Sequence, residues 1–249
     1  MIKLSNFLIL FLVFMLGMAL FNYQDTNAHF HCGQPFAPFV NLSTCDLSGQ
    51  ELFQVNLSGA DLSGANFSGD ILKRIDFSNA TLSGANLSMV DYFQGILSGA
   101  NLKGADLSNA KIEEVAILAT DFSDAILKGI SISNLSAEGS NFSGADLSGA
   151  IIKGVGFSNV DFSGANLSGI DLSGINLSNS KLKDANLSGV DFSGAVFKNV
   201  VLTNADLSGA NLKGSDLSGA ILKGVDLTDA DLSGVILRGV DLSGIDLKG

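Results

Sequence analysis

An apolar residue, large in every case except Ala137, returns at every fifth position of this 249-residue chain from Leu42 to Leu247. The 42 pentapeptides in that stretch are typified by residues 60–64, which read Ala-Asp-Leu-Ser-Gly. A repeat of fixed period constrains a fold more firmly than local propensity does, because each unit packs against similar units before and after it. The register therefore predicts one repetitive structure over residues 41–249.

Each pentapeptide has an inner and an outer side. The central position is Leu or Phe in 36 of the 42 units, and the position two residues earlier is mostly Ala or Val. Residues two apart in an extended chain share a face, so these positions point together and the Asp or Asn between them points away. A period of five fits neither a helix nor a plain strand, so the chain must turn once per unit. The turn residues agree: the position two after the centre is Gly, Asn or Asp in 35 units, the types that accept positive φ most readily.

Units such as residues 60–64 and 165–169 resemble those of the pentapeptide-repeat proteins, and the resemblance covers the chain from Val40 onward. It implies an all-β fold, a right-handed quadrilateral parallel β-helix with four pentapeptides in each coil and the central residues filling the interior. At about 4.8 Å per coil, about ten coils would make a rod on the order of 50 Å long.

The N-terminal segment has a different composition. Lys3 precedes an apolar run over residues 7–21, and a polar stretch then leads to the small residue Ala28. This layout is typical of a secretory signal peptide, so we expect residues 1–28 to be cleaved and the protein to be exported, periplasmic or secreted. An uncleaved membrane anchor is the alternative, although the run is shorter than the ~20 residues that a spanning helix needs.

The two cysteines, Cys32 and Cys45, both follow this segment closely. An even cysteine count in an exported protein favours a disulfide. The bridge would tie residues 29–40 over the first coil as a cap, with a stabilisation of about 3 kcal/mol in the chain-entropy model. The β-helix itself is expected over residues 41–249. Two free thiols in a cytosolic protein are the alternative, which requires that residues 1–28 are no signal peptide.

The repeats offer little support for catalysis. No histidine follows His31, so the many serines lack an imidazole that would activate them, and we expect neither an enzyme nor a cofactor. We also predict no metal site, with one alternative at the N-terminus. If cleavage follows Ala28, the free amine, His29 and His31 would offer nitrogen ligands suited to square-planar Cu(II) or Ni(II).

The resemblance implies one function by analogy, because some pentapeptide-repeat proteins shield a topoisomerase by imitating DNA with an acidic rod. The chain has a net charge of −11, and its most acidic face, which includes Asp206 and Asp226, carries seven carboxylates. A DNA duplex carries about 30 charges over a comparable length, so the imitation is poor. We therefore predict an exported, non-enzymatic rod for protein–protein recognition, with no nucleic acid as partner. An inhibitor or immunity-type protein that acts by DNA-like mimicry is the alternative.

The repeat loosens in residues 88–95, 111–119 and 136–138, where other residues replace the usual outward Ser and Gly. The face with the fewest charges also collects apolar residues at outward positions, and these form the candidate surface for an unknown protein partner: Ile96, Ala116, Leu118, Val196 and Ile236. The C-terminal coil lacks a separate capping segment, so its open end predicts an end-to-end homodimer. A membrane is expected as a partner only if the N-terminal segment is uncleaved.

Overall fold

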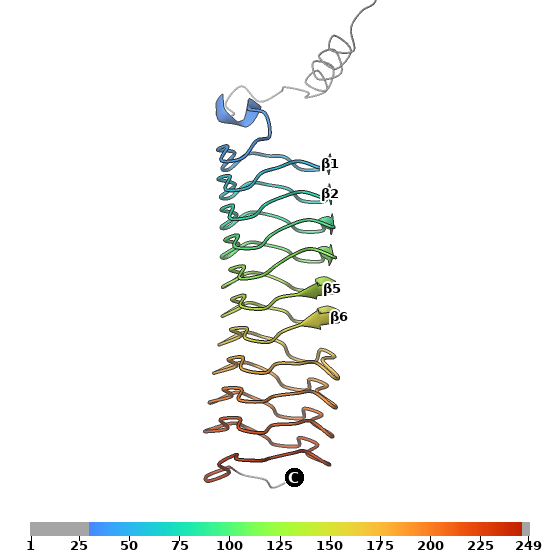
Figure 1. The fold of residues 1–249 in the computed structure, drawn as a ribbon, viewed down its shortest axis with the longest axis vertical. Coiled ribbons are helices and arrows are strands. Elements are labelled where there is room, and N and C mark those ends of the chain that lie inside the picture. The colour runs from blue at the N-terminus through green and yellow to red at the C-terminus, as the bar shows by residue number, and fades with distance from the viewer. Residues whose placement is uncertain (1–29, 246–249) are drawn as a thin grey trace, which may run out of the picture. The chain divides into compact units, whose positions relative to one another are not determined.

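The computed structural model describes residues 30–245, and the chain divides into two compact units, Met1–Phe30 and His31–Gly249. The second unit is a stack of similar coils, which Figure 1 shows from the side. The elements of the described residues, in chain order, are the 3-10 helix η2 (Phe30–Gly33) and the strands β1 (Glu51–Phe53), β2 (Ile71–Lys73), β3 (Asp91–Phe93), β4 (Lys111–Glu113), β5 (Ser131–Ser136) and β6 (Ile151–Gly156).

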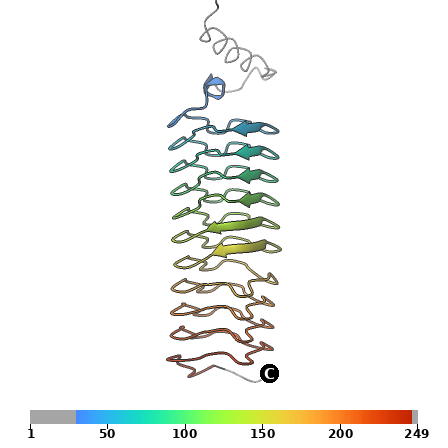
Figure 2. The same cartoon turned by 45° about the vertical axis from the view of Figure 1, so that its right-hand side comes forward.

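Parallel backbone pairing holds successive coils together. The six strands form one sheet in the order of the sequence, and residues that pair are 20 positions apart, as Leu52 and Leu72 are. Five turns of the chain therefore lead from β1 to β6 (Figure 2). Isolated bridges carry the same offset along the other sides of the coil, from the pair Asn41 and Asp61 as far as Ile236. The predicted fold class, a parallel β-helix with four pentapeptides per coil, is confirmed.

The backbone turns where the sequence predicts a turn. Every residue two after a pentapeptide centre, from Thr44 to Gly244, has a positive φ. Met89 and Glu114 turn in this way too, with φ of 58° and 53°, although such residues disfavour the left-handed region. A hydrogen bond of 2.9 Å from the backbone N–H of Met89 to the carbonyl of Ser108 shows what holds the turn. Pairing between coils thus imposes the turn where the local residue does not favour it.

The interior is a column of side chains. The central residues over 42–227 are buried, with Ile152 only partly so, and the smaller inward residues two positions earlier fill the space between them. Aromatic rings stack from coil to coil, with centroids 4.8 Å apart for Phe122 and Phe142 and 5.1 Å apart for Phe142 and Phe162. Each layer therefore contacts the layers before and after it, and the stability of the solenoid is spread along its length.

A disulfide ties the segment before the first coil to the core. Cys32 is bonded to Cys45 with their Cα atoms 5.5 Å apart, which confirms the predicted pair. Cys45 is buried at an inward position of its pentapeptide, and Cys32 and Phe36 pack against the core. The N-terminal end of the solenoid is thus anchored covalently as well as by packing.

Several predictions concern residues outside the described range. The expected signal peptide, residues 1–28, and His29 precede it, the side chain of His31 is not described, and the last four residues of the C-terminal coil follow it. Among residues 30–245, the structure contains no helix of the length and apolarity that crossing a membrane requires.

Candidate interaction surface

The five residues of the predicted surface all lie on one side of the solenoid, and three of them adjoin. Ile96 and Ala116 are bridged neighbours in consecutive coils. Leu118 lies beside them, and its carbonyl accepts the backbone N–H of Gly99 at 3.0 Å. Ile96 is 40% exposed and Leu118 is 46% exposed, so these side chains form a small apolar patch.

Val196 and Ile236 lie farther along the same side. Asp216 is bridged to both of them and forms an ion pair of 3.4 Å with Lys198. At 20 residues per coil, four coils separate Val196 from Ala116. The structure therefore does not join the five residues into one continuous surface.

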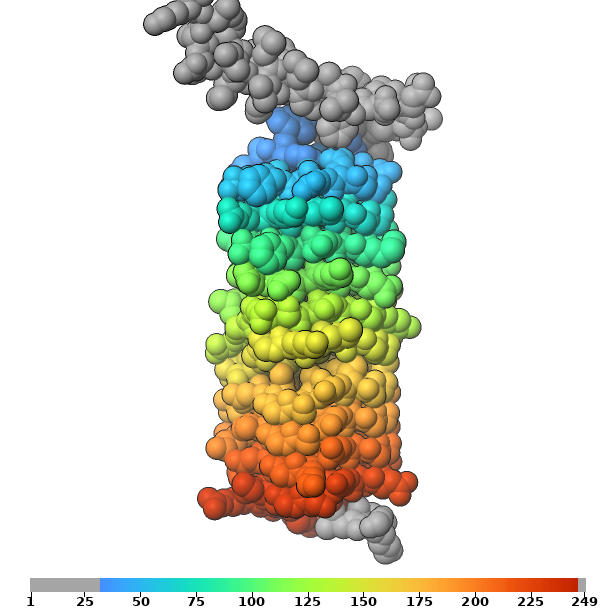
Figure 3. Space-filling view, turned by 90° about the vertical axis from the view of Figure 1, so that its right-hand side faces the viewer, coloured from blue at the N-terminus to red at the C-terminus, as the bar shows by residue number. Residues whose placement is uncertain are grey.

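The three segments in which the repeat loosens are brought together by the coil length. Strands β3 and β4 belong to two of these segments and pair along their whole length, and the backbone N–H of Ala119 donates to the carbonyl of Glu138 at 3.0 Å. Figure 3 shows how coils follow one another in sequence order on the side that carries the strands. The outward residues of 88–95, 111–119 and 136–138, together with Ile96, are termed the irregular surface.

The irregular surface combines exposed apolar side chains with acidic ones. Ile96 and Leu118 contribute the apolar patch, whereas Met89, which is 64% exposed, lies nearly half a coil away from Leu118. Lys111 is the one basic residue of these segments, against four acids: Asp91, Glu113, Glu114 and Glu138. Such a surface complements apolar side chains flanked by basic ones.

One feature that includes residues of this surface is not anticipated by the apolar pattern. Three long polar side chains stack at one corner of consecutive coils, where Arg74 Nε donates to Gln94 Oε1 at 3.3 Å and Gln94 Nε2 donates to Glu114 Oε2 at 2.8 Å. All three residues have a positive φ. From Gly154 to Gly234 every coil has glycine at this corner. The lack of glycine at the same corner in the earlier coils is the sequence feature that could have predicted this row of polar side chains. Non-glycine residues held in the left-handed region often accompany functional sites.

The outward carboxylates of the regular coils are used within their own units. Asp106 Oδ1 accepts the backbone N–H of Ser108 at 2.9 Å, and this Asx turn recurs throughout the solenoid. The hydrogen bonds that Ser48 donates hold the pKa of Asp46 below its usual value. These acids and serines therefore form turns, which accounts for their regular recurrence.

Stacked carboxylates occur, but amides interrupt them. Asp206 and Asp226 are bridged neighbours, which agrees with the predicted acidic face. Elsewhere on that face Asn66 Nδ2 donates to Asp46 Oδ1 at 2.9 Å, so a neutral residue separates the acids. Within the described part of the chain, no group of three or more His, Cys, Asp or Glu is placed to hold a metal ion.

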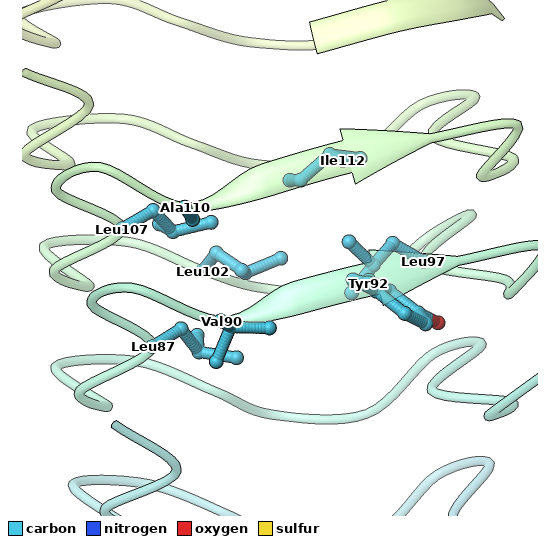
Figure 4. A pocket seen from close by; sticks show the side chains of 8 residues that line it. All are labelled: Leu87, Val90, Tyr92, Leu97, Leu102, Leu107, Ala110 and Ile112. Atoms are coloured by element: carbon cyan, nitrogen blue, oxygen red, sulfur yellow. The ribbon is translucent and has the colours of Figure 1, made fainter. Parts of the chain in front are cut away.

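A cavity of about 10 Å³ lies inside the coils that carry β3 and β4 (Figure 4). Its lining is entirely apolar apart from one tyrosine: Leu87, Val90, Tyr92, Leu97, Leu102, Leu107, Ala110 and Ile112. The volume matches about one water molecule, and the hydroxyl of Tyr92 donates to the carbonyl of Ile75 at 2.7 Å. This space is a packing gap and offers no ligand site.

Comparisons with known proteins find solved structures to which this chain is similar in sequence. HetL, a pentapeptide repeat protein involved in heterocyst differentiation regulation from the cyanobacterium Nostoc sp. strain PCC 7120, is 28% identical over 83% of this chain and 89% of its own, with a TM-score of 0.32. QnrB1, a plasmid-mediated fluoroquinolone resistance protein, is 24% identical over 77% of this chain and 93% of its own, with a TM-score of 0.41. A pentapeptide repeat protein from the cyanobacterium Cyanothece 51142 is 26% identical over 50% and 89%, with a TM-score of 0.31. A search of curated proteins found no match.

The family model of pentapeptide repeats matches in eight copies, over residues 39–69, 71–91, 96–129, 140–179, 156–194, 180–219 and 210–249. Proteins with these repeats are generally non-catalytic structural or interaction proteins. The unbroken register of five, the coil of 20 residues and the match of the family model lead to one assignment: this chain belongs to the pentapeptide-repeat family.

Proposed function

We propose that this protein is a non-enzymatic rod that binds another protein through the irregular surface. The observation that carries the proposal is the adjacency of the three segments that depart from the repeat. In the regular coils the outward Asp, Asn and Ser recur so evenly that one coil resembles the next. A partner that docks at one place needs such a departure, because specificity is a difference in affinity between that place and the others.

The chemistry of the irregular surface indicates the kind of partner. Ile96 and Leu118 supply exposed apolar contact area on one side of the coil. The irregular surface carries four acids and one lysine, so basic residues on the partner would be attracted during encounter. The partner is therefore a protein with an apolar patch and a basic rim.

Export to an oxidising compartment is part of the proposal. The layout of residues 1–28 supports it, and so does the disulfide between Cys32 and Cys45, since such bonds persist mainly outside the cytosol. Inhibition by DNA-like mimicry is the less favoured function, because amides such as Asn66 interrupt the acidic face.

Two matched substitutions test the surface. Ile96 and Ile236 occupy the same outward position on the same side and are 40% and 42% exposed, but only Ile96 belongs to the irregular surface. We expect wild-type protein and Ile236→Glu to cross-link to the same partner in the native compartment. Ile96→Glu should weaken the affinity for that purified partner at least about tenfold, as a charge buried in a contact does.

Calorimetry with the purified partner gives the decisive comparison, after circular dichroism has shown that both variants are folded. Equal affinities for wild type and Ile96→Glu would place the contact elsewhere. Equal losses in the two variants would contradict a surface confined to the irregular coils. Binding to Asp206 and Asp226 by a nucleic-acid-binding enzyme would favour the mimicry alternative.

A further inference from the structure

Asp70 breaks the rule that inward positions are apolar. It lies two residues before a pentapeptide centre, where most units have Ala, Val or Ile, and it is 0% exposed. Its Oδ1 accepts the backbone N–H of Gln50 at 2.8 Å, while its Oδ2 is buried without a hydrogen-bond partner. Leaving a carboxylate oxygen buried and unpaired is unfavourable, and the repeat itself does not require it.

Two buried serines show what a polar side chain does at this position. Ser180 Oγ accepts the backbone N–H of Val160 at 3.0 Å and donates to the carbonyl of Phe157 at 2.7 Å. Ser140 makes the same two bonds, to the residues 20 and 23 positions before it. Each hydroxyl bridges the N–H and the C=O of one turn in the preceding coil. This bridge requires a group that both accepts and donates.

Asp70 stands in the same relation to a turn of the first coil. Gln50 is 20 positions before it, and Leu47 is 23 positions before it. In a typical turn the N–H donates to the carbonyl three residues back, as Cys45 does to Leu42 at 3.2 Å, whereas the N–H of Gln50 donates to Asp70. An ionised carboxylate only accepts hydrogen bonds, but a protonated carboxyl also donates one. A proton on Oδ2 would complete the bridge to the carbonyl of Leu47.

We propose that Asp70 is a proton-operated clamp on the first coil, which bridges the N–H of Gln50 and the carbonyl of Leu47 when its carboxyl is protonated and keeps only the bond from Gln50 when it ionises. The turn directly follows Cys45, so the clamp acts on the coil to which the disulfide anchors the cap. Loss of the proton leaves a charge in the core and removes the donor to the carbonyl of Leu47, and the first coil then opens more easily.

The titration of Asp70 sets the pH range of the clamp. Burial raises the pKa of Asp70 to about 6, although the backbone N–H of Gln50 donates to it, and the charge of Asp46 raises the pKa further. The reference pKa of an Asp carboxyl is 3.8. Because the pKa is higher in the folded chain, the stabilisation is complete below pH 3.8 and is lost as the pH rises through about 6. The clamp is therefore closed in mildly acidic surroundings and released at neutral pH.

Among the described residues of the coils next to Asp70, no buried counter-charge opposes this titration. Gln50 and Val90, the inward neighbours of Asp70 in the two adjacent coils, are uncharged. The charged residues of these coils are all at least partly exposed: Asp46, Glu51, Asp61, Lys73, Arg74, Asp76 and Asp91. Lys73 pairs with Glu51 at 2.9 Å on the outer side of the sheet.

Hydrogen exchange and a direct titration test the clamp on the full chain with its disulfide intact. In wild type, exchange protection of the amides of residues 45–50, corrected for intrinsic rates, should fall up to about 100-fold between pH 4 and pH 8. In Asp70→Asn, whose amide accepts and donates at every pH, protection should stay level. Asp70→Ser, which copies Ser180, should behave likewise, and residues 157–160 should be insensitive to pH in all three proteins.

Carbon NMR of the Asp70 carboxyl in wild type needs no variant and should show a midpoint well above 3.8. A midpoint at or below 3.8 would overturn the proposal. So would level protection in wild type across this range. The same pH dependence in both substituted proteins would also overturn it, because another group would then be responsible.

Discussion

Replacing Gly95 with alanine should destabilise the solenoid by about 3 kcal/mol, at the upper end of overpacking effects. The backbone of Gly95 has no positive φ, so the effect is one of space. An alanine Cβ there would lie 2.0 Å from Cε2 of Tyr92 and 2.3 Å from its hydroxyl oxygen. The ring cannot move aside freely, because its hydroxyl donates to the carbonyls of Ile75 at 2.7 Å and Ile96 at 3.1 Å. Urea unfolding followed by circular dichroism measures the loss.

Two further variants separate the clash from a general effect of alanine. Gly156 also has an ordinary φ, and an added Cβ would meet its nearest atom, the hydroxyl oxygen of Ser136, at 3.7 Å, so Gly156→Ala should be nearly neutral. Combining Gly95→Ala with Tyr92→Leu restores the commonest pair of inward residues and should recover much of the stability. The prediction is contradicted if Gly95→Ala loses no more stability than Gly156→Ala, or if adding Tyr92→Leu recovers none of the lost stability. Either result would show that the Tyr92 ring does not require glycine at position 95.

Removing the ring of Phe142 should destabilise the protein by about 3–5 kcal/mol. Phe142 is 0% exposed, and its ring stacks between those of Phe122 and Phe162 in the adjacent coils, at 4.8 and 5.1 Å. Phe142→Ala would remove both stacking contacts and the edge-on contact with Phe157 at 6.0 Å, and would leave a cavity between layers. Because each coil contacts only its neighbours, the weakened layer should also uncouple the two halves of the solenoid. We therefore expect a lower unfolding midpoint and a second transition.

Phe53→Ala is the matched control, since Phe53 is 58% exposed on β1. Its effect should stay within about 0.5 kcal/mol, as surface substitutions usually do. Similar losses for the two variants would contradict the assignment of central residues to the interior. A single unchanged transition in Phe142→Ala would contradict nearest-neighbour coupling along the stack.

Much of the fold follows from the period of five, because it fixes which side chains face inward and where the backbone turns. In the structure the backbone turns even in units that lack a typical turn residue. Arg74, for example, adopts a φ of 55° because hydrogen bonds to a neighbouring coil determine the backbone there. The positions of β5 and β6 were not predictable in this way. Both strands run for six residues and continue through the corner at which the strands β1–β4 have already ended. No residue pattern in the sequence predicts that these two strands are longer.

The candidate surface was predictable in part. The exposed positions of Ile96 and Leu118 follow from the register, and so does the adjacency of β3 and β4 once a coil of 20 residues is assumed. The hydrogen bonds that link Arg74, Gln94 and Glu114 depend on how far each side chain extends and in which direction. The repeat period does not determine this. The bridge from Asp70 to Gln50 likewise depends on how one turn is closed, which only coordinates reveal.

The distance between labels placed far apart along the chain tests the central claim, that the described pentapeptides form one stack with 20 residues per coil. Ser63 and Ser243 are 180 residues apart and occupy equivalent outward positions nine coils from each other. Spin labels on Ser63→Cys and Ser243→Cys, with Cys32 and Cys45 left in their disulfide, should give one narrow distance distribution near 43 Å, nine strand spacings. A broad distribution, or a distance near half that value, would contradict the stack.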